Sequence, residues 1–445
     1  MKALLAASAA PDGNATYRTM WRWHFYAGLF VLPFVLVLSV TGSIYLFKPQ
    51  IDRWEERDYR GLATGGAVSP DRQLAAVMAA YPRARFDNYR LPERSGDCAM
   101  VQIGLADGRQ REVFVSPQGR VLGAFDPEAR ISPTVGRIHG SLLLGKWGDW
   151  LVELAASWTI VMILTGLYMW WPRPLRLAGT FWPRLSLRGR PLLKELHRVT
   201  GFWIAGLVLV MLASGLPWAQ SWGSAFKWAR TELGLVQGPQ SWKTGPAAGG
   251  GHHHGGAGAP RPAVQAGLPL SAFVAKARGE RMAFPVVILP PNAPQRFGPP
   301  SANVWTVRSE TQNRPLTRQV TYDPATGAET GRRGFADTHL VDRVVNTGIA
   351  WHEGQLFGLA NQLIGVATAV ALVAISVMGA LMWLRRRPKG RLGGPPPVKG
   401  IRPRWAIPAL VAAGIALPFF GASLIVLALL DRVLAASRRP RPLAG

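Results

Sequence analysis

Two kinds of residue are scarce in this chain, and each scarcity excludes a class of protein. Cys98 is the single cysteine among 445 residues, which excludes a disulfide framework, a Cys-ligated iron–sulfur cluster and a zinc ribbon. Charged residues make up 17% of the chain, below the level of about 25% that is usual in soluble domains. Hydrophobic residues make up 48%. This composition indicates a membrane protein with sizeable polar parts.

Five apolar stretches are long enough to cross a bilayer, which takes about 20 residues. The first is too long and too deep in the chain for a cleaved signal peptide, so we expect an uncleaved anchor. The fifth contains Pro408, Gly414 and Pro418; we expect a fifth span there, with a bent or re-entrant element as the alternative. The stretches lie near residues 21–47, 147–171, 200–222, 356–384 and 405–430.

The short loops that follow the second and fourth stretches are strongly basic. The loop 172–199 contains seven Lys or Arg and one acid, Glu195, and the loop 385–404 contains eight Lys or Arg and no acid. Because Lys and Arg accumulate in cytoplasmic loops, both loops and the N-terminus are expected on the cytoplasmic side of the membrane. Much of the net charge of +26 is thus a topology signal, so we expect lipid and no nucleic acid as a partner.

This orientation divides the chain into alternating spans and polar segments. Two long segments with mixed charges are expected outside the membrane, as folded domains. The predicted order is the N-terminus and first span (1–47), the first outer domain (48–146), the second span (147–171), a cytoplasmic loop (172–199), the third span (200–222), the second outer domain (223–355), the fourth span (356–384), a cytoplasmic loop (385–404), the fifth span (405–430) and a tail (431–445).

The membrane parts of the two halves align without gaps, which indicates an internal duplication. An offset of 173 relates His24 in the first span to His197 in the third. An offset of 213 relates His139, before the second span, to His352, before the fourth, and also relates Gly166 to Gly379 and Met169 to Met382. Since each half crosses twice, the repeats share one orientation and are related by an axis along the membrane normal.

The outer domains also match each other. Each begins with a helix-like segment, Ser69–Met78 and Leu270–Ala277, and Ser69 before Pro70 suits a helix start. Each continues with strand-like alternation and a hairpin, at Val113–Gly123 and Val320–Gly331. We therefore expect two small α+β domains. The second contains a Gly, Pro and Ala-rich stretch, 238–269, which is typical of a flexible loop.

The duplication arranges four histidines at two depths. His24 and His197 lie at the inner ends of outward-running spans, and His139 and His352 at the outer ends of inward-running spans. Each pair is expected to face across the repeat axis. Histidine at membrane depth is rare and usually functional, and an axial histidine pair suits a b-type haem used for electron transfer. No Cys-x-x-Cys-His motif is present, so covalent c-type attachment is excluded.

Two alternatives to haem remain at this point. In the first, the histidines simply occupy the ends of spans. In the second, they hold another metal, although two imidazoles at each depth leave the coordination shell of zinc or copper incomplete. Glycines at helical spacing from the histidines would either let a flat macrocycle lie on the backbone or pack helices together. These glycines are Gly28, Gly42, Gly201 and Gly215.

The remaining candidate ligands are weaker. His252, His253 and His254 lie in the Gly-rich stretch and are either a weak metal site or an incidental run. His339 precedes the fourth span and competes with His352 as a ligand. Cys98 is expected to be a small buried thiol.

The chain resembles PepSY-associated transmembrane proteins over about residues 21–431. The resemblance rests on the His-containing spans, the span end Met169-Trp170-Trp171-Pro172-Arg173, the two inserted hairpin domains and the final Pro418-Phe-Phe-Gly421 run. It implies that the outer domains are PepSY-like. Some members of that family are inner-membrane ferric-siderophore reductases with two haems, and His24, His139, His197 and His352 match the family's histidine positions. The 238–269 insertion departs from the family's compact domain, so details of substrate binding in the family are not transferred to this segment.

Together these features predict a mainly α-helical membrane protein whose four-helix core comes from two parallel repeats. The favoured function is that of an oxidoreductase with two haems b, each held by a histidine pair as axial ligands, that reduces a ferric siderophore or other ferric chelate outside. No flavin or nicotinamide motif is present, so the electrons must come from a quinol or a separate reductase. The alternatives are a non-enzymatic anchor for outer binding domains, and a transporter of iron or chelate, against which no span shows an obvious mid-membrane acid.

Overall fold

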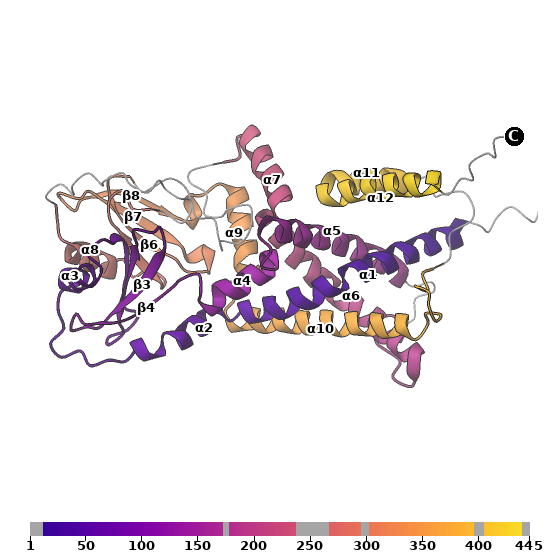
Figure 1. The fold of residues 1–445 in the computed structure, drawn as a ribbon, viewed down its shortest axis with the longest axis horizontal. Coiled ribbons are helices and arrows are strands. Elements are labelled where there is room, and N and C mark those ends of the chain that lie inside the picture. Colours follow the sequence, from indigo (N-terminus) through magenta and orange to yellow (C-terminus); the bar gives the residue numbers. More distant parts are fainter. Residues whose placement is uncertain (1–11, 172–177, 237–266, 295–301, 396–404, 438–445) are drawn as a thin grey trace, which may run out of the picture. The chain divides into compact units, whose positions relative to one another are not determined.

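The computed structural model describes residues 12–171, 178–236, 267–294, 302–395 and 405–437, and its elements are labelled in Figure 1. The chain divides into two compact units. The span unit comprises residues 1–40, 140–226 and 366–445, and the sheet unit comprises residues 41–139 and 227–365. The Gly-rich stretch with His252, His253 and His254 lies outside the described residues, apart from its last few positions.

Four helices in the described part of the chain are long and apolar enough to cross a membrane. They are α1 (Asp12–Tyr45), α5 (Gly145–Trp170), α6 (Gly189–Gly215) and α10 (Leu359–Leu384). Their most apolar windows have mean hydropathies of 2.2, 1.7, 2.1 and 2.3 in chain order. The first four predicted spans are confirmed, and the protein is a multi-pass membrane protein. The helix α6 begins before residue 200 because the basic segment ahead of the apolar stretch is helical too.

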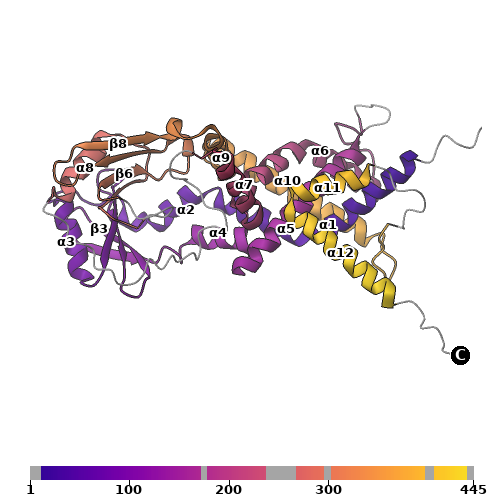
Figure 2. The ribbon, with the colours of Figure 1, turned by 90° about the horizontal axis from the view of Figure 1, so that it is seen from above.

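The fifth stretch is two helices with a break between them, which is the bent element expected as the alternative to a straight fifth span. It forms α11 (Ala406–Ala416) and α12 (Pro418–Ser437), which pack on each other and diverge from the break in Figure 2. Leu417 leaves the helical region with φ −129° and ψ 84°, because a following proline disfavours the helical conformation. A Cβ on Gly414 would lie 3.1 Å from the Cα of Gly421, so the absence of a side chain lets the two helices approach.

The outer histidines lie on short helices of their own rather than at the ends of spans, which corrects the predicted placement. His139 is in α4 (Ile131–Ser141), and His352 ends α9 (Leu340–His352). Leu142, Leu143 and Gly145 have φ of 51°, 60° and 57°, a left-handed conformation that ends a helix. Positive φ values at residues 354 and 358 separate α9 from α10 in the same way.

The two predicted outer domains are one continuous sheet, so their separation was also wrong. The eight strands are antiparallel and run in the order β4-β3-β2-β1-β5-β6-β7-β8. The halves join where Tyr89 of β1 faces Ile288 of β5 and Arg90 faces Val287. This pairing satisfies backbone groups that two separate domains would expose at an edge. The strands are β1 (Arg85–Arg90), β2 (Ala99–Gly104), β3 (Gln110–Val115), β4 (Val121–Phe125), β5 (Val286–Leu289), β6 (Trp305–Ser309), β7 (Arg318–Tyr322) and β8 (Glu329–Gly334).

The sheet packs on two helices that lie side by side, α3 (Pro70–Ala80) and α8 (Leu270–Gly279) (Figure 1). Val77 of α3 and Phe273 of α8 are fully buried in one core with strand residues of both halves. The Ser69 hydroxyl accepts the Arg72 N–H at 3.3 Å, which confirms the predicted helix start. Both predicted hairpins are confirmed as β3–β4 and β7–β8. Shorter helices complete the chain: α2 (Lys48–Glu55), α7 (Gln220–Glu232), η1 (Arg57–Tyr59), η2 (Leu216–Trp218), η3 (Arg314–Leu316) and η4 (Phe335–Asp337).

Candidate functional site

His24 and His197 come together inside the span unit, where α1 and α6 bring them from positions far apart in the sequence. Their ring centres are 6.2 Å apart and their planes are perpendicular, at 90°. Both rings are partly buried. The two imidazoles that the sequence pairs near one side of the membrane are therefore neighbours.

Backbone carbonyl groups determine which nitrogen of each ring carries the proton. Nδ1 of His24 lies 2.9 Å from the Met162 oxygen of α5, and Nδ1 of His197 lies 2.9 Å from the Ile375 oxygen of α10. Because a carbonyl oxygen only accepts, both Nδ1 atoms donate, and the neutral rings carry their lone pairs on Nε2. A histidine ligand that is held in this way by a second partner is the usual arrangement at metal and haem centres.

His139 and His352 form the second pair, inside the sheet unit. Their ring centres are 6.3 Å apart and their planes cross at 73°. Nδ1 of His139 lies 3.1 Å from the Thr41 hydroxyl, near the end of α1, and Thr41 is buried. The hydroxyl holds the ring in place and, since it both donates and accepts, suits either tautomer.

Glycines let neighbouring helices reach the imidazole rings. A Cβ on Gly166 of α5 would lie 3.0 Å from His24 Cε1, and a Cβ on Gly42 of α1 would lie 3.0 Å from His139 Cε1. Both distances are shorter than an ordinary contact, so a methyl group at either position would press the ring away by a few tenths of an ångström. A Cβ on Gly28 would meet only Met162 Sδ, at 3.6 Å, and one on Gly201 would meet nothing within 4 Å. Gly42 lies against an imidazole, whereas Gly28 and Gly201 border more open space.

The distance between ring centres in both pairs would suit two imidazoles bound to one iron. With metal–nitrogen bonds of about 2.0 Å and ring centres about 1.1 Å beyond each nitrogen, two axial imidazoles have centres about 6.2 Å apart. Two rings packed edge to face without a metal have centres about 4.5–7 Å apart. The distance alone therefore fits both a metal-bound pair and a packed pair. The Nδ1 donors of His24 and His197 favour the ligand arrangement, because they leave both lone pairs on Nε2.

The same contacts recur at the two offsets of the proposed duplication. His24 and His197 differ by 173 positions, and their carbonyl partners at Met162 and Ile375 differ by 213. Sequence reasoning paired the histidines but missed these carbonyl groups, because a backbone acceptor leaves no trace in residue type. The offset of 213 relates Met162 to Ile375 in the sequence, although it does not distinguish these two residues from others in the same spans.

Other ionisable neighbours in the sequence turn away from the histidine pairs. Glu195, two residues before His197, is bound by Arg184 at 2.8 Å from each carboxylate oxygen. Nδ1 of His339 accepts the Val341 N–H at 3.2 Å and caps α9, so His339 has a structural role there. Within the described ranges, no group of three or more His, Cys, Asp or Glu side chains is arranged to hold a metal ion.

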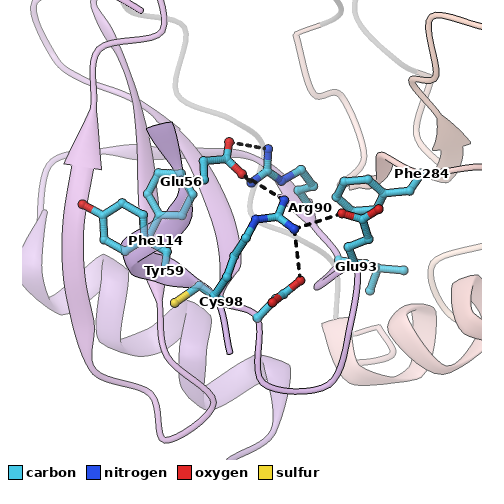
Figure 3. A pocket seen from close by; sticks show the side chains of 10 residues that line it. Glu56, Tyr59, Arg90, Glu93, Cys98, Phe114 and Phe284 are labelled. Atoms are coloured by element: carbon cyan, nitrogen blue, oxygen red, sulfur yellow. Dashed lines mark hydrogen bonds and ion pairs between the residues drawn. The ribbon is translucent and has the colours of Figure 1, made fainter. Parts of the chain in front are cut away.

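A separate pocket lies in the sheet unit, beside the junction of β1 and β5 (Figure 3). Its charged side chains pair with one another: Arg90 with Glu56 at 2.7 Å, and Arg60 with Glu93 at 3.0 Å. Cys98 at its edge is buried beside Phe114, as expected, and burial raises the pKa of its thiol to about 11. The pairing makes this pocket a structural junction rather than a second candidate site.

Comparison with known proteins places one family profile over most of the chain. The family described as PepSY-associated TM region matches residues 21–386, a range that includes all four paired histidines. No curated protein matches the sequence.

Proposed function

The chain belongs to the family of PepSY-associated transmembrane proteins, and from this premise and the histidine pairs we propose that it is a transmembrane electron-transfer oxidoreductase. It carries two haems b and delivers electrons to an acceptor outside the membrane, a ferric chelate such as a ferric siderophore. The proposal rests mainly on the distance between ring centres within each imidazole pair, which is 6.2 Å in one pair and 6.3 Å in the other.

Each histidine pair would bind one haem iron. Nε2 of His24 and His197 would hold one iron, and the ring nitrogens of His139 and His352 the other. Bound haem would supply a one-electron Fe(III)/Fe(II) couple in a setting of low polarity. The carbonyl groups of Met162 and Ile375 hold the His24 and His197 rings in one tautomer and orientation. This anchoring supports electron transfer because a ligand that does not turn keeps the geometry of the iron constant in both oxidation states.

Charge and sequence motifs support the direction and the source of the electrons. The basic loops that follow α5 and α10 favour a cytoplasmic N-terminus at a bacterial inner membrane, with the sheet unit outside. The chain has no flavin or nicotinamide motif, so a quinol or a separate reductase is the donor. Reduction outside would release iron from the chelate, because Fe(II) is held less tightly than Fe(III) by hard oxygen ligands.

Visible absorption spectra of the full-length protein in detergent test the proposal, with pyridine-haemochrome quantification of haem. We expect low-spin b-type bands and about two haems per chain. His24→Ala and His139→Ala should each remove one haem. The control His339→Ala should keep both, since that side chain caps a helix.

Absence of haem after expression with ample haem supply would overturn the proposal. It would favour the second candidate, a non-enzymatic membrane protein that binds an envelope partner through its sheet unit. That candidate is supported by the eight-stranded sheet. A transporter of iron or chelate is the third candidate, and uptake of labelled ferric chelate without reduction would favour it.

A further inference from the structure

Two carboxyl groups are buried in the second span, near its start rather than at its middle. Asp149 and Glu153 lie one turn apart in α5 and are 4% and 3% exposed. Both belong to the candidate span Gly145–Trp170. Sequence inspection missed them because they lie near the start of the span, between the exposed Trp147 and the apolar centre. Ionisable residues in spans are costly and usually functional.

Glu153 has the partners that an ionised carboxylate needs. Its Oε2 accepts the Ser221 N–H at 2.9 Å, and its Oε1 accepts the Trp222 N–H at 2.8 Å. Both amides belong to the first turn of the 13-residue helix α7. The free N–H groups and the positive end of the helix dipole stabilise a negative charge there.

One oxygen of Asp149 lacks such partners among the described residues. Its Oδ2 is inaccessible to solvent and has no hydrogen-bond partner among the described residues. Glu153 lies one turn away on the same helix, and Lys146 on that helix is exposed. The neighbouring α4 contributes the Ser141 carbonyl group, which lies against Gly148, and α7 directs its amides to Glu153.

An ionised Asp149 would therefore place negative charge on a buried oxygen that has no hydrogen-bond partner among the described residues, one helical turn from a second carboxyl group. Such a group neutralises by binding a proton, because an isolated carboxylate is very costly in a medium of low polarity. Oδ2 of Asp149 is inaccessible to solvent, so a ligand larger than a proton does not reach it. Within the described ranges, Asp149 also belongs to no group of three or more side chains that could hold a metal ion.

We propose that Asp149 holds a proton at neutral pH and that the Asp149–Glu153 pair is a proton-exchange site of the second span. The carboxylate of Asp149 takes the proton from hydronium, and water is released. In the proposed state the negative charge is on Glu153, which accepts the two α7 amide N–H groups, so the pair carries one proton and one negative charge. The inference stands on the burial and partners of these two residues and does not depend on haem.

Infrared spectroscopy of the full-length protein in detergent tests this site at neutral pH. Exposed carboxyl groups are ionised there, so the carbonyl stretch of a protonated carboxyl group reports a buried one. We expect such a band in the wild-type protein, sensitive to deuterium exchange, absent in Asp149→Asn and retained in Glu153→Gln. Asparagine has the shape and neutrality of the protonated side chain, so this variant should fold.

Labelling the wild-type protein with aspartate carrying 13C in its side-chain carboxyl group gives a second readout that needs no variant. The band should shift with the label. A wild-type protein without a label-sensitive band at neutral pH, or a band that persists unchanged in Asp149→Asn, overturns the proposal. Haem content measured on the same samples keeps the two proposals separate, because the infrared result holds whether or not haem is bound.

Discussion

A single added methyl group at Gly166 tests how closely α5 contacts the His24 ring. In Gly166→Ala the new Cβ would lie 3.0 Å from His24 Cε1 and 3.4 Å from its Nδ1. Ordinary contacts begin at 3.4 Å, so the ring must move by a few tenths of an ångström. The ring resists, because its Nδ1 donates to the Met162 carbonyl at 2.9 Å, one turn earlier on the same helix. Contact and hydrogen bond thus come from one face of α5.

Gly379→Ala is the matched control, since Gly379 holds the equivalent position against His197. There the added Cβ would lie 3.6 Å from Cε1, an ordinary contact. The gain in helix propensity from glycine to alanine is common to both variants and cancels when they are compared. What remains is the overpacking at Gly166, which costs about 1–3 kcal/mol in a well-packed site.

Equilibrium unfolding in mixed detergent micelles, followed by tryptophan fluorescence, measures the two free energies at equal haem loading. We expect Gly166→Ala to unfold more readily than Gly379→Ala by that amount. Equal stabilities, or a less stable Gly379→Ala, would refute the close packing of α5 against His24.

Three further predictions concern the sheet unit. Glu56→Gln should lower the free energy of unfolding by about 3–5 kcal/mol, because it leaves Arg90 without its buried partner, as chemical denaturation would show. Burial opposes ionisation of Glu56, yet Arg90 and Arg130 outweigh it and lower its pKa. The wild-type protein should therefore lose this stabilisation as the pH falls through the acid range, and the variant should show a flatter acid limb. Cys98 is 6% exposed and its thiol pKa is about 11, so it should not react with a maleimide at neutral pH until the protein is denatured. Mass spectrometry detects the adduct, and rapid labelling of the native protein would contradict the buried position. Ser69→Ala removes the cap of α3 and should cost about 0.5–2 kcal/mol, whereas an unchanged unfolding midpoint would show that the cap contributes nothing.

Local patterns predicted much of the fold. The first four spans follow from runs of apolar residues, and the helix at Ser69 and the two hairpins follow from caps and turns. The pairing of the four histidines followed from two fixed offsets. These features depend on a residue and its near neighbours in the sequence, or on a sequence repeat, and each of these can be recognised without a structure.

Contacts between distant segments were not predictable in this way. The central strands β1 and β5 pair and join the two halves into one sheet, although the sequence of each half predicts a separate domain. The break at Leu417 depends on one proline whose effect competes with an apolar run that favours a span. Asp149 and Glu153 look like ordinary residues near a span end until burial and the amides of α7 distinguish them.

The sequence by itself determined that this is a multi-pass membrane protein with repeated histidines, because hydropathy, charge bias and periodicity are sums over neighbouring residues. Only the tertiary structure decided that the ring centres lie 6.2 and 6.3 Å apart and that two of the rings donate to backbone carbonyl groups. It also decided that Oδ2 of Asp149 has no hydrogen-bond partner among the described residues. Those facts depend on distances between atoms that are far apart along the chain, and the packing of helices and strands sets such distances.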